Sequence, residues 1–180
     1  VAKRLASSGV IDVVATAAPG IDDIVVLGKI KQLERSGEHD LVVVDGPAAG
    51  HAITFLMSPR SMAATMRGGP VHAQAIEAGE MLGDPARCQV VLVTLPETTP
   101  VSEAASLQED LRRARIEPFA WVINRSLIAS GTRDPLLAAR LGNEAAQVAR
   151  VTQGLAKRTF LVPWAARPPV GLAALHALVD

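Results

Sequence analysis

The sequence contains little sulfur and few aromatic rings. Of its 180 residues one is cysteine, and Phe, Trp and Tyr together make up 3%. The single cysteine, Cys88, excludes a disulfide within the chain and any metal cluster built from several thiolates of one chain. The scarcity of rings disfavours binding by stacking of bases on aromatic side chains. We therefore expect a cytoplasmic protein rather than a disulfide-rich secreted one.

The chain also lacks an excess of charge of either sign. Lys and Arg number 18, as do Asp and Glu, which gives a formal net charge of +0. This balance provides no electrostatic basis for binding nucleic acid or an anionic membrane surface. No apolar run is long enough for a membrane span and no signal peptide is visible, so we expect no direct membrane insertion.

The composition that remains is globular. Hydrophobic residues make up 49% and charged residues 20%, and the length suffices for one domain with a sizeable core. We expect a single domain over residues 1–180, without repeats or a linker. The sequence begins with Val1 and reads at once like the middle of a domain. This indicates the C-terminal part of a longer protein.

Short apolar runs alternate with helical periodicity along the chain. The runs that predict strands cover residues 41–45, 89–95, 119–124 and 160–163. Such alternation is typical of an α/β fold with a doubly wound, mostly parallel sheet. Residues 11–15 could add a fifth short strand or belong to a helix-rich entry segment.

The predicted helices begin at recognisable start signals. These signals are Gly20 followed by Asp22 and Asp23, then Thr99 with Pro100, then Asp134 with Pro135. A last short helix carries Leu172, Leu175 and Leu178. Residues 59–87 exceed a minimal crossover between strands, and we interpret them as a helical insertion. Its methionines at helical spacing are more often core residues than a binding surface.

The most informative stretch is residues 41–51, LVVVDGPAAGH. Asp45 follows an apolar run, where the carboxyl end of a buried strand presents its side chain to a ligand crevice. A turn formed by Gly46, Pro47 and Gly50 can approach a bound group closely. A carboxylate beside a Gly-rich turn suits Mg²⁺ and a terminal phosphate. The alternative is a helix cap in a buried turn, and the stretch alone leaves both open.

Several motifs resemble the family of arsenical pump-driving and tail-anchored-protein targeting ATPases. Residues 45–52, DGPAAGHA, are similar to its switch II signature DTAPTGHT, although Gly46, Ala49 and Ala52 stand where Thr is usual. Further similarities occur in family order, at PGID (19–22), TLPE (94–97), WVINRSL (121–127) and VPW (162–164). The resemblance covers about residues 15–178 and is closer to the bacterial arsenical pump-driving branch.

This resemblance implies a P-loop NTPase fold of the deviant Walker A class, in which ATP with Mg²⁺ closes a dimer. It assigns Asp45 to catalysis through the waters of Mg²⁺, with Gly46, Pro47 and Gly50 in a nucleotide-dependent switch loop. It assigns Asn124 to adenine, but a strand-end Asn making a local turn is the alternative. The resemblance also assigns three further residues to the nucleotide site. Glu103 lies near the start of a helix, and Pro163 and Trp164 belong to the loop that wraps the base.

His51 occupies a position that the resemblance links to metalloid binding in arsenical pump ATPases. The metalloid cysteines of the family have no match here, and soft As(III) prefers thiolates. Cys88 is better explained as a small hydrophobic residue at the start of a strand. The Cys-x-x-Cys zinc clasp of the targeting branch is absent as well, so no interchain zinc is expected.

The 180 residues contain no GxxxxGK[S/T] phosphate-binding loop. We therefore expect the first strands of the sheet and the phosphate cradle to be missing, and these residues alone not to hydrolyse ATP. The expected partners are a second copy or the N-terminal half of the same ATPase, and a membrane pump or client protein. The rival interpretations are a non-catalytic carrier of the same fold, and a targeting ATPase that shields a hydrophobic segment.

Overall fold

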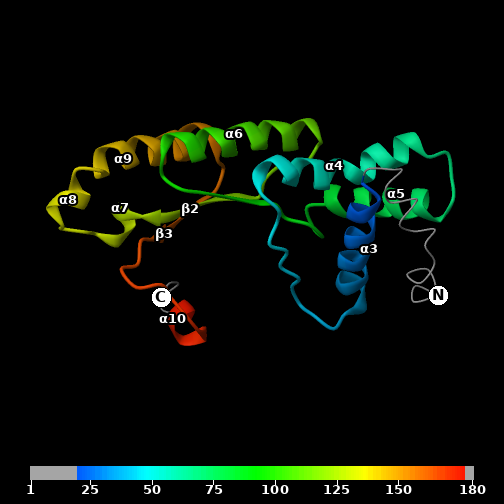
Figure 1. Ribbon diagram of the computed structural model, residues 1–180, viewed down its shortest axis with the longest axis horizontal. Coiled ribbons are helices and arrows are strands. Elements are labelled where there is room, and N and C mark those ends of the chain that lie inside the picture. The colour runs from blue at the N-terminus through cyan, green and yellow to red at the C-terminus, as the bar shows by residue number, and fades with distance from the viewer. Residues whose placement is uncertain (1–19, 177–180) are drawn as a thin grey trace. The chain divides into compact units, whose positions relative to one another are not determined.

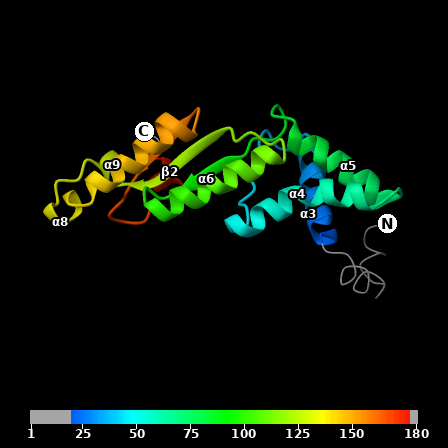
Figure 2. The ribbon, with the colours of Figure 1, turned by 90° about the horizontal axis from the view of Figure 1, so that it is seen from above.

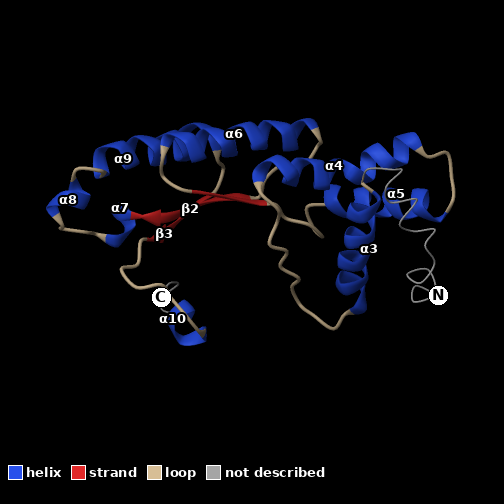
Figure 3. Cartoon of the chain, in the orientation of Figure 1, coloured by secondary structure: helices blue, strands red, loops and turns tan. Residues whose placement is uncertain are grey.

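The computed structural model describes residues 20–176 (Figure 1). The chain forms two compact units that divide between Cys88 and Gln89, and each unit is described by itself. Figure 3 shows that the described part of the first unit is helical and that the strands of the described residues belong to the second. The prediction for residues 11–15 lies outside the described residues. Among residues 20–176, no helix is long and apolar enough to cross a membrane.

The described part of the first unit contains three helices: α3 (Ile21–Ser36), α4 (Ala49–Thr65) and α5 (Pro70–Gly83). Helix α3 starts where predicted, directly after Gly20, whose φ of 94° is left-handed and favours glycine. Its apolar side buries Ile24 and Leu27, which are 2% and 1% exposed. Against them pack small and flexible side chains of α4 and α5: Met62, Ala75, Ala78, Met81 and Leu82.

Helix α4 contains a buried proline, Pro59, which has no N–H to donate to the carbonyl of Phe55 one turn earlier. The hydroxyl of Ser58 donates to that carbonyl instead, over 2.8 Å. The helix therefore continues past the proline without leaving the carbonyl unpaired. On the facing helix, a Cβ at Gly79 would lie 3.8 Å from the ring of Pro59, so the two helices approach closely there.

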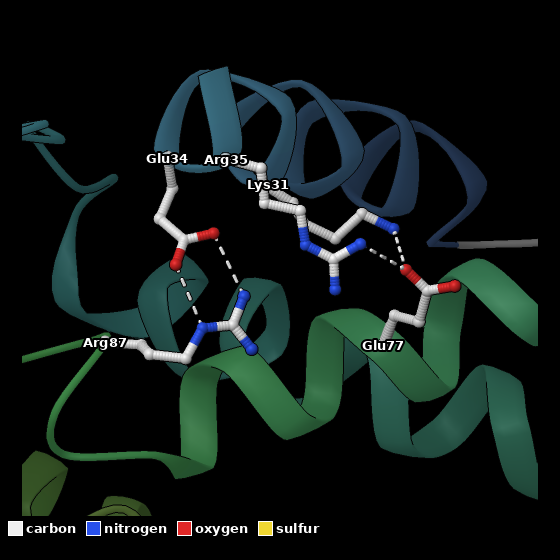
Figure 4. Close-up of polar contacts among 5 residues, drawn as sticks. All are labelled: Lys31, Glu34, Arg35, Glu77 and Arg87. Atoms are coloured by element: carbon white, nitrogen blue, oxygen red, sulfur yellow. Dashed lines mark hydrogen bonds and ion pairs between the residues drawn. The ribbon is translucent and has the colours of Figure 1, made fainter. Parts of the chain in front are cut away.

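Ion pairs join α3 to α5 and to the segment that follows it (Figure 4). Glu77 accepts from Lys31 over 2.6 Å and from Arg35 over 3.2 Å. The carboxylate of Glu34 accepts hydrogen bonds from Nε and Nη2 of Arg87 over 2.9 and 3.0 Å. This bidentate contact also fixes the orientation of the guanidinium. The hydrogen bond from Arg87 lowers the pKa of Glu34, and that from Lys31 lowers the pKa of Glu77.

The strand predicted at residues 41–45 was wrong, because Leu41 to Asp45 form a loop. Leu41 and Val43 are 77% and 81% exposed. The β-branched residues give this run a preference for extended backbone, but a parallel strand gains its hydrogen bonds only from a neighbour. Among the described residues the sheet comprises the three strands given below, and the run pairs with none of them.

The second unit contains a parallel sheet with strand order β1-β2-β3. The strands are β1 (Val91–Thr94), β2 (Ala120–Ser126) and β3 (Thr159–Pro163). They confirm three of the four predicted strands and the α/β class with parallel pairing. Alternate residues of β1 are buried and exposed, which is the pattern of a strand covered on one face.

Helices α6 (Thr98–Arg113) and α9 (Leu141–Arg150) lie side by side over one face of this sheet (Figures 1 and 2). Two side-chain contacts join them, Gln147 to Thr98 and Arg150 to Ser102. Beneath them lie fully buried apolar side chains. They include Val101, Leu111, Trp121, Ile123 and Val151.

The predicted helix boundaries need two corrections. Helix α6 begins at Thr98 and not after a cap at Thr99, so Pro100 is its third residue. A proline is tolerated there, because the N–H groups of the first helical turn have no carbonyl partner within the helix. The helical segment that begins at the start signal of Asp134 is not one helix but three, α8 (Pro135–Ala138), α9 and the π-helix η1 (Val151–Leu155). Asp134 does cap α8, since its Oδ1 accepts from the N–H of Leu136 over 2.8 Å.

Two short helices complete the second unit, α7 (Leu127–Ser130) directly after β2 and α10 (Leu172–His176) near the end. The predicted last helix is thus present, and Leu178 lies outside the described residues. Residues 59–87 are largely helical, as the second part of α4 and α5. Their interpretation as an insertion into a single domain stays a prediction.

Candidate functional site

The predicted switch residues lie in the first unit, between α3 and α4. Asp45, Gly46 and Pro47 are exposed in a loop. Gly50 was predicted in a turn, but it lies in the first turn of α4, because the carbonyl of Ala48 accepts from Ala52 over 3.0 Å and starts the helix. Among the described residues, no atom lies within 4 Å of a Cβ built on Gly46 or Gly50. These residues therefore leave open space directly beside the two glycines.

His51 is exposed in the same turn of α4. The segment thus presents a carboxylate, an imidazole and the first amides of a 17-residue helix, and amides at a helix start suit an anionic group. Among residues 20–176 there is no group of three or more His, Cys, Asp or Glu that could hold a metal ion. A Mg²⁺ beside Asp45 would take its other ligands from water and phosphate, as is usual for this ion.

The predicted base-binding residues lie in the second unit, at the carboxyl ends of β2 and β3. Asn124 is half-buried, and its Oδ1 accepts from the N–H of Arg125 over 2.9 Å. This contact is the local turn that was the alternative to adenine binding. A carbonyl oxygen has two lone pairs and the amide also has two donors, so the contact leaves Asn124 able to pair with a base.

The loop after β3 reaches the same place. Ser126 is the register partner of Pro163, and its carbonyl accepts from the N–H of Trp164 over 2.9 Å. Trp164 is 39% exposed. The structure therefore brings Asn124, Pro163 and Trp164 together at one end of the sheet, where parallel folds bind ligands.

The backbone between these residues is unusual. Arg125 has a φ of 57°, in the left-handed region that residues other than glycine rarely adopt. The pairing of β2 with β3 is irregular between Ile123 and Ser126. Strain of this kind concentrates at functional sites, and here it lies directly beside Asn124.

Sequence reasoning missed the residue that holds this strand end in place, Glu144. Its carboxylate is buried, with 4% of the residue exposed. It accepts from the hydroxyl of Ser126 and from the N–H groups of Leu127 and Ile128. An acidic residue in the first turn of a helix ordinarily indicates a solvated partner of the helix dipole. The pattern of α9 alone therefore gave no signal of this contact.

Two further residues that the sequence analysis discussed, Glu103 and Cys88, belong neither to the switch segment nor to the strand ends that carry Asn124 and Trp164. Glu103 lies exposed on α6, and its assignment to the nucleotide site stays a prediction. Cys88 is half-buried, and burial raises the pKa of its thiol. A raised pKa disfavours the thiolate that soft metal ions bind, in agreement with its interpretation as a small hydrophobic residue.

Known proteins match the chain along most of its length. The model of the anion-transporting ATPase family matches residues 2–71, which include the switch segment. The arsenical pump-driving ATPase of Escherichia coli is 38% identical over 171 residues, which is 89% of this chain. This chain belongs to the anion-transporting ATPase family. Membership implies a P-loop NTPase fold.

Two further relatives agree with this assignment. The arsenical pump-driving ATPase of Acidiphilium multivorum is 39% identical over 167 residues, 91% of this chain and 28% of its own length. The protein named ATPase BagA of Mycobacterium tuberculosis is 31% identical over 127 residues, 67% of this chain and 37% of its own length. The Escherichia coli relative is likewise covered over 28% of its length. The chain thus spans about a third or less of these members of the anion-transporting ATPase family.

Proposed function

We propose that these residues supply the switch segment and the adenine-binding wall of an ATPase whose hydrolysis cycle drives an arsenical pump or a similar partner. One observation carries the base-binding part. Asn124 lies near the end of β2, and Pro163 and Trp164 lie at the end of β3, the strand that pairs with β2. An amide with donors and acceptors beside a half-exposed ring suits a purine base.

The switch segment would face the phosphates. The exposed carboxylate of Asp45 has the ligand chemistry that Mg²⁺ prefers. Bound Mg²⁺ neutralises charge on the phosphate oxygens. Asp45 would orient water on that ion, and the open loop at Gly46 and Pro47 would move with the state of the nucleotide. The phosphate-binding loop would come from a polypeptide segment outside these 180 residues, because they contain none.

The physiological output rests on similarity to the pump-driving relatives. In this proposal two protomers, or two homologous halves, close on ATP in the cytoplasm and reopen after hydrolysis. The closure acts on a membrane pump or on a cargo protein. His51, in the first turn of α4, would belong to the same switch segment.

The base-binding part is tested by Asn124→Ala in the full-length protein. We expect ATP affinity to fall by about 1–2 kcal/mol, roughly 5- to 30-fold, and GTP affinity to fall less. Asn143→Ala is the matched control, because Asn143 is exposed on α9. Equal losses for ATP and GTP would show that Asn124 is structural.

The catalytic part is tested by turnover of Mg-ATP. The 180 residues alone should show none, and the full-length protein should lose activity on Asp45→Ala, since catalysis of phosphoryl transfer depends on positioning and charge neutralisation. Turnover by the 180 residues that Asp45→Ala abolishes would contradict the proposal. Failure of the full-length protein to bind ATP would favour a non-catalytic carrier of the same fold.

A further inference from the structure

Glu144 places a buried carboxyl group at the end of β2. In the sequence it lies well away from the residues assigned to the nucleotide. The carboxylate lies 2.5 Å from Oγ of Ser126, 3.0 Å from N of Leu127 and 3.1 Å from N of Ile128. Burial of a carboxylate is costly unless donors satisfy it. Here three donors do, and all three belong to the turn that follows the base-binding strand.

Ser126 connects this carboxylate to both sides of the candidate base site. Its Oγ also accepts from N of Ala129, which caps α7. Its carbonyl receives the N–H of Trp164, and its register partner is Pro163. Displacement of Ser126 would therefore shift the loop that carries Trp164 as well as the end of β2.

Between Ser126 and Asn124 stands Arg125 in its left-handed conformation. Such a conformation persists only where the surrounding structure determines it on both sides. The pairing of Ile123 with Leu161 fixes the strand before it. The hydrogen bonds of Glu144 fix the turn after it.

We propose that Glu144 is a positioning residue for the nucleotide base. Through Ser126 it holds Arg125 left-handed, and thereby sets the direction of the Asn124 amide and the place of the Trp164 ring. This inference rests on the proposed function, because it explains how the site proposed there keeps its geometry. Glu144 itself touches no base in this arrangement.

The test uses Glu144→Gln and Ser126→Ala in the full-length protein. Glutamine keeps the size but turns an NH₂ group toward donors that need an acceptor. Alanine at 126 removes only the hydroxyl bonds. Affinities for ATP, GTP and inorganic tripolyphosphate are measured beside the midpoint of urea unfolding. Val101→Ala is the destabilised control, since Val101 is fully buried in α6, and Glu109→Gln is the exposed acidic control.

We expect Glu144→Gln to weaken ATP binding about 3- to 10-fold, with a smaller loss for Ser126→Ala. The ratio of ATP to GTP affinity should fall in both, whereas tripolyphosphate binding should change less than about twofold. Val101→Ala should lower the unfolding midpoint and leave the ratio unchanged. A merely structural Glu144 would behave like Val101 in this comparison.

An unchanged ratio in folded Glu144→Gln overturns the inference. If that variant does not fold, an unchanged ratio in Ser126→Ala overturns it instead. The two proposals fail separately. If Asn124→Ala lowers the ratio and neither of these variants does, only the positioning role is lost. If Asn124→Ala leaves the ratio unchanged, the base site itself is wrong and the positioning role falls with it.

Discussion

The indole nitrogen of Trp121 donates a hydrogen bond to Oε1 of Gln108 over 2.8 Å inside the core of the second unit. The two residues are 1% and 2% exposed. The amide nitrogen of Gln108 donates in turn to the carbonyl of Leu155 over 3.0 Å, at the end of the π-helix. One glutamine thus joins β2, α6 and η1, and leaves neither polar end of its amide unpaired.

This arrangement predicts that Gln108→Met destabilises the protein by about 1–3 kcal/mol, although methionine has a similar shape. The loss arises because the indole N–H and the carbonyl of Leu155 remain buried without partners. Urea unfolding followed by Trp fluorescence measures it. Gln153→Met, at an exposed position of η1, should change the free energy of unfolding little. Equal effects of the two substitutions would contradict the prediction.

The ion pairs of α3 predict a loss of stability in acid. Arg87 lowers the pKa of Glu34 and Lys31 lowers the pKa of Glu77, each in the folded state relative to the usual value of 4.5. A lowered folded pKa contributes stability that is complete above the unfolded pKa and is lost as the pH falls through the folded pKa. Below pH 4.5 the first unit should therefore lose stability progressively.

Chemical unfolding at several pH values, monitored by helix content, measures this loss. Glu34→Gln and Glu77→Gln should each flatten the acid dependence, and added salt should reduce it, because both carboxylates are partly exposed. Glu38→Gln, at an exposed position after α3, serves as the control. A steeper acid dependence in the Glu34 or Glu77 variants would refute the assignment.

The strand predictions from the sequence were correct where the strand pairs with another strand of the sheet, as β1, β2 and β3 do. The runs that became β1, β2 and β3 are apolar and short, and so is the run at residues 41–45. Composition sets only the preference for extended backbone, while pairing decides whether a strand forms. The run at residues 41–45 could not be separated from the others, because pairing is not a local property.

In the candidate site, too, features of the local sequence could be predicted and tertiary contacts could not. Asn124, Pro163 and Trp164 could be proposed from the sequence, because they stand at or directly after the ends of predicted strands and match a family motif. Glu144 was missed, because its function depends on tertiary contacts with Ser126 and Leu127 across the chain. The left-handed Arg125 was missed for a related reason, since arginine gives no local sign of this conformation.

The chemistry of Cys88 predicts that As(III) and Sb(III) do not bind tightly to these residues. One half-buried thiol with a raised pKa cannot replace the several thiolates that soft metalloids prefer. Calorimetric titration with As(III) should show no stoichiometric complex, and His51→Ala should change nothing. A tight complex that is lost on Cys88→Ser would show that the thiol is a ligand.

The face of the sheet opposite α6 predicts how the isolated chain behaves in solution. Val93, Val122 and Phe160 are register partners and form an apolar row across the three strands. Val93 is 63% exposed and Phe160 54% in the structure of the described residues. Parallel sheets are ordinarily covered on both faces. An open row of this kind favours association with another surface.

We therefore expect the isolated 180 residues to self-associate or aggregate unless another polypeptide covers this row. Sedimentation velocity over a wide range of concentration should show growth in size, and Phe160→Lys should reduce it, because a charge at the centre of an apolar contact opposes burial. Leu136→Lys is the matched control, since Leu136 is 83% exposed on α8 and lies outside the row. A monodisperse monomer that unfolds cooperatively would show that the three-stranded sheet is stable with one face open. In that case the apolar row would need an explanation other than coverage by a partner.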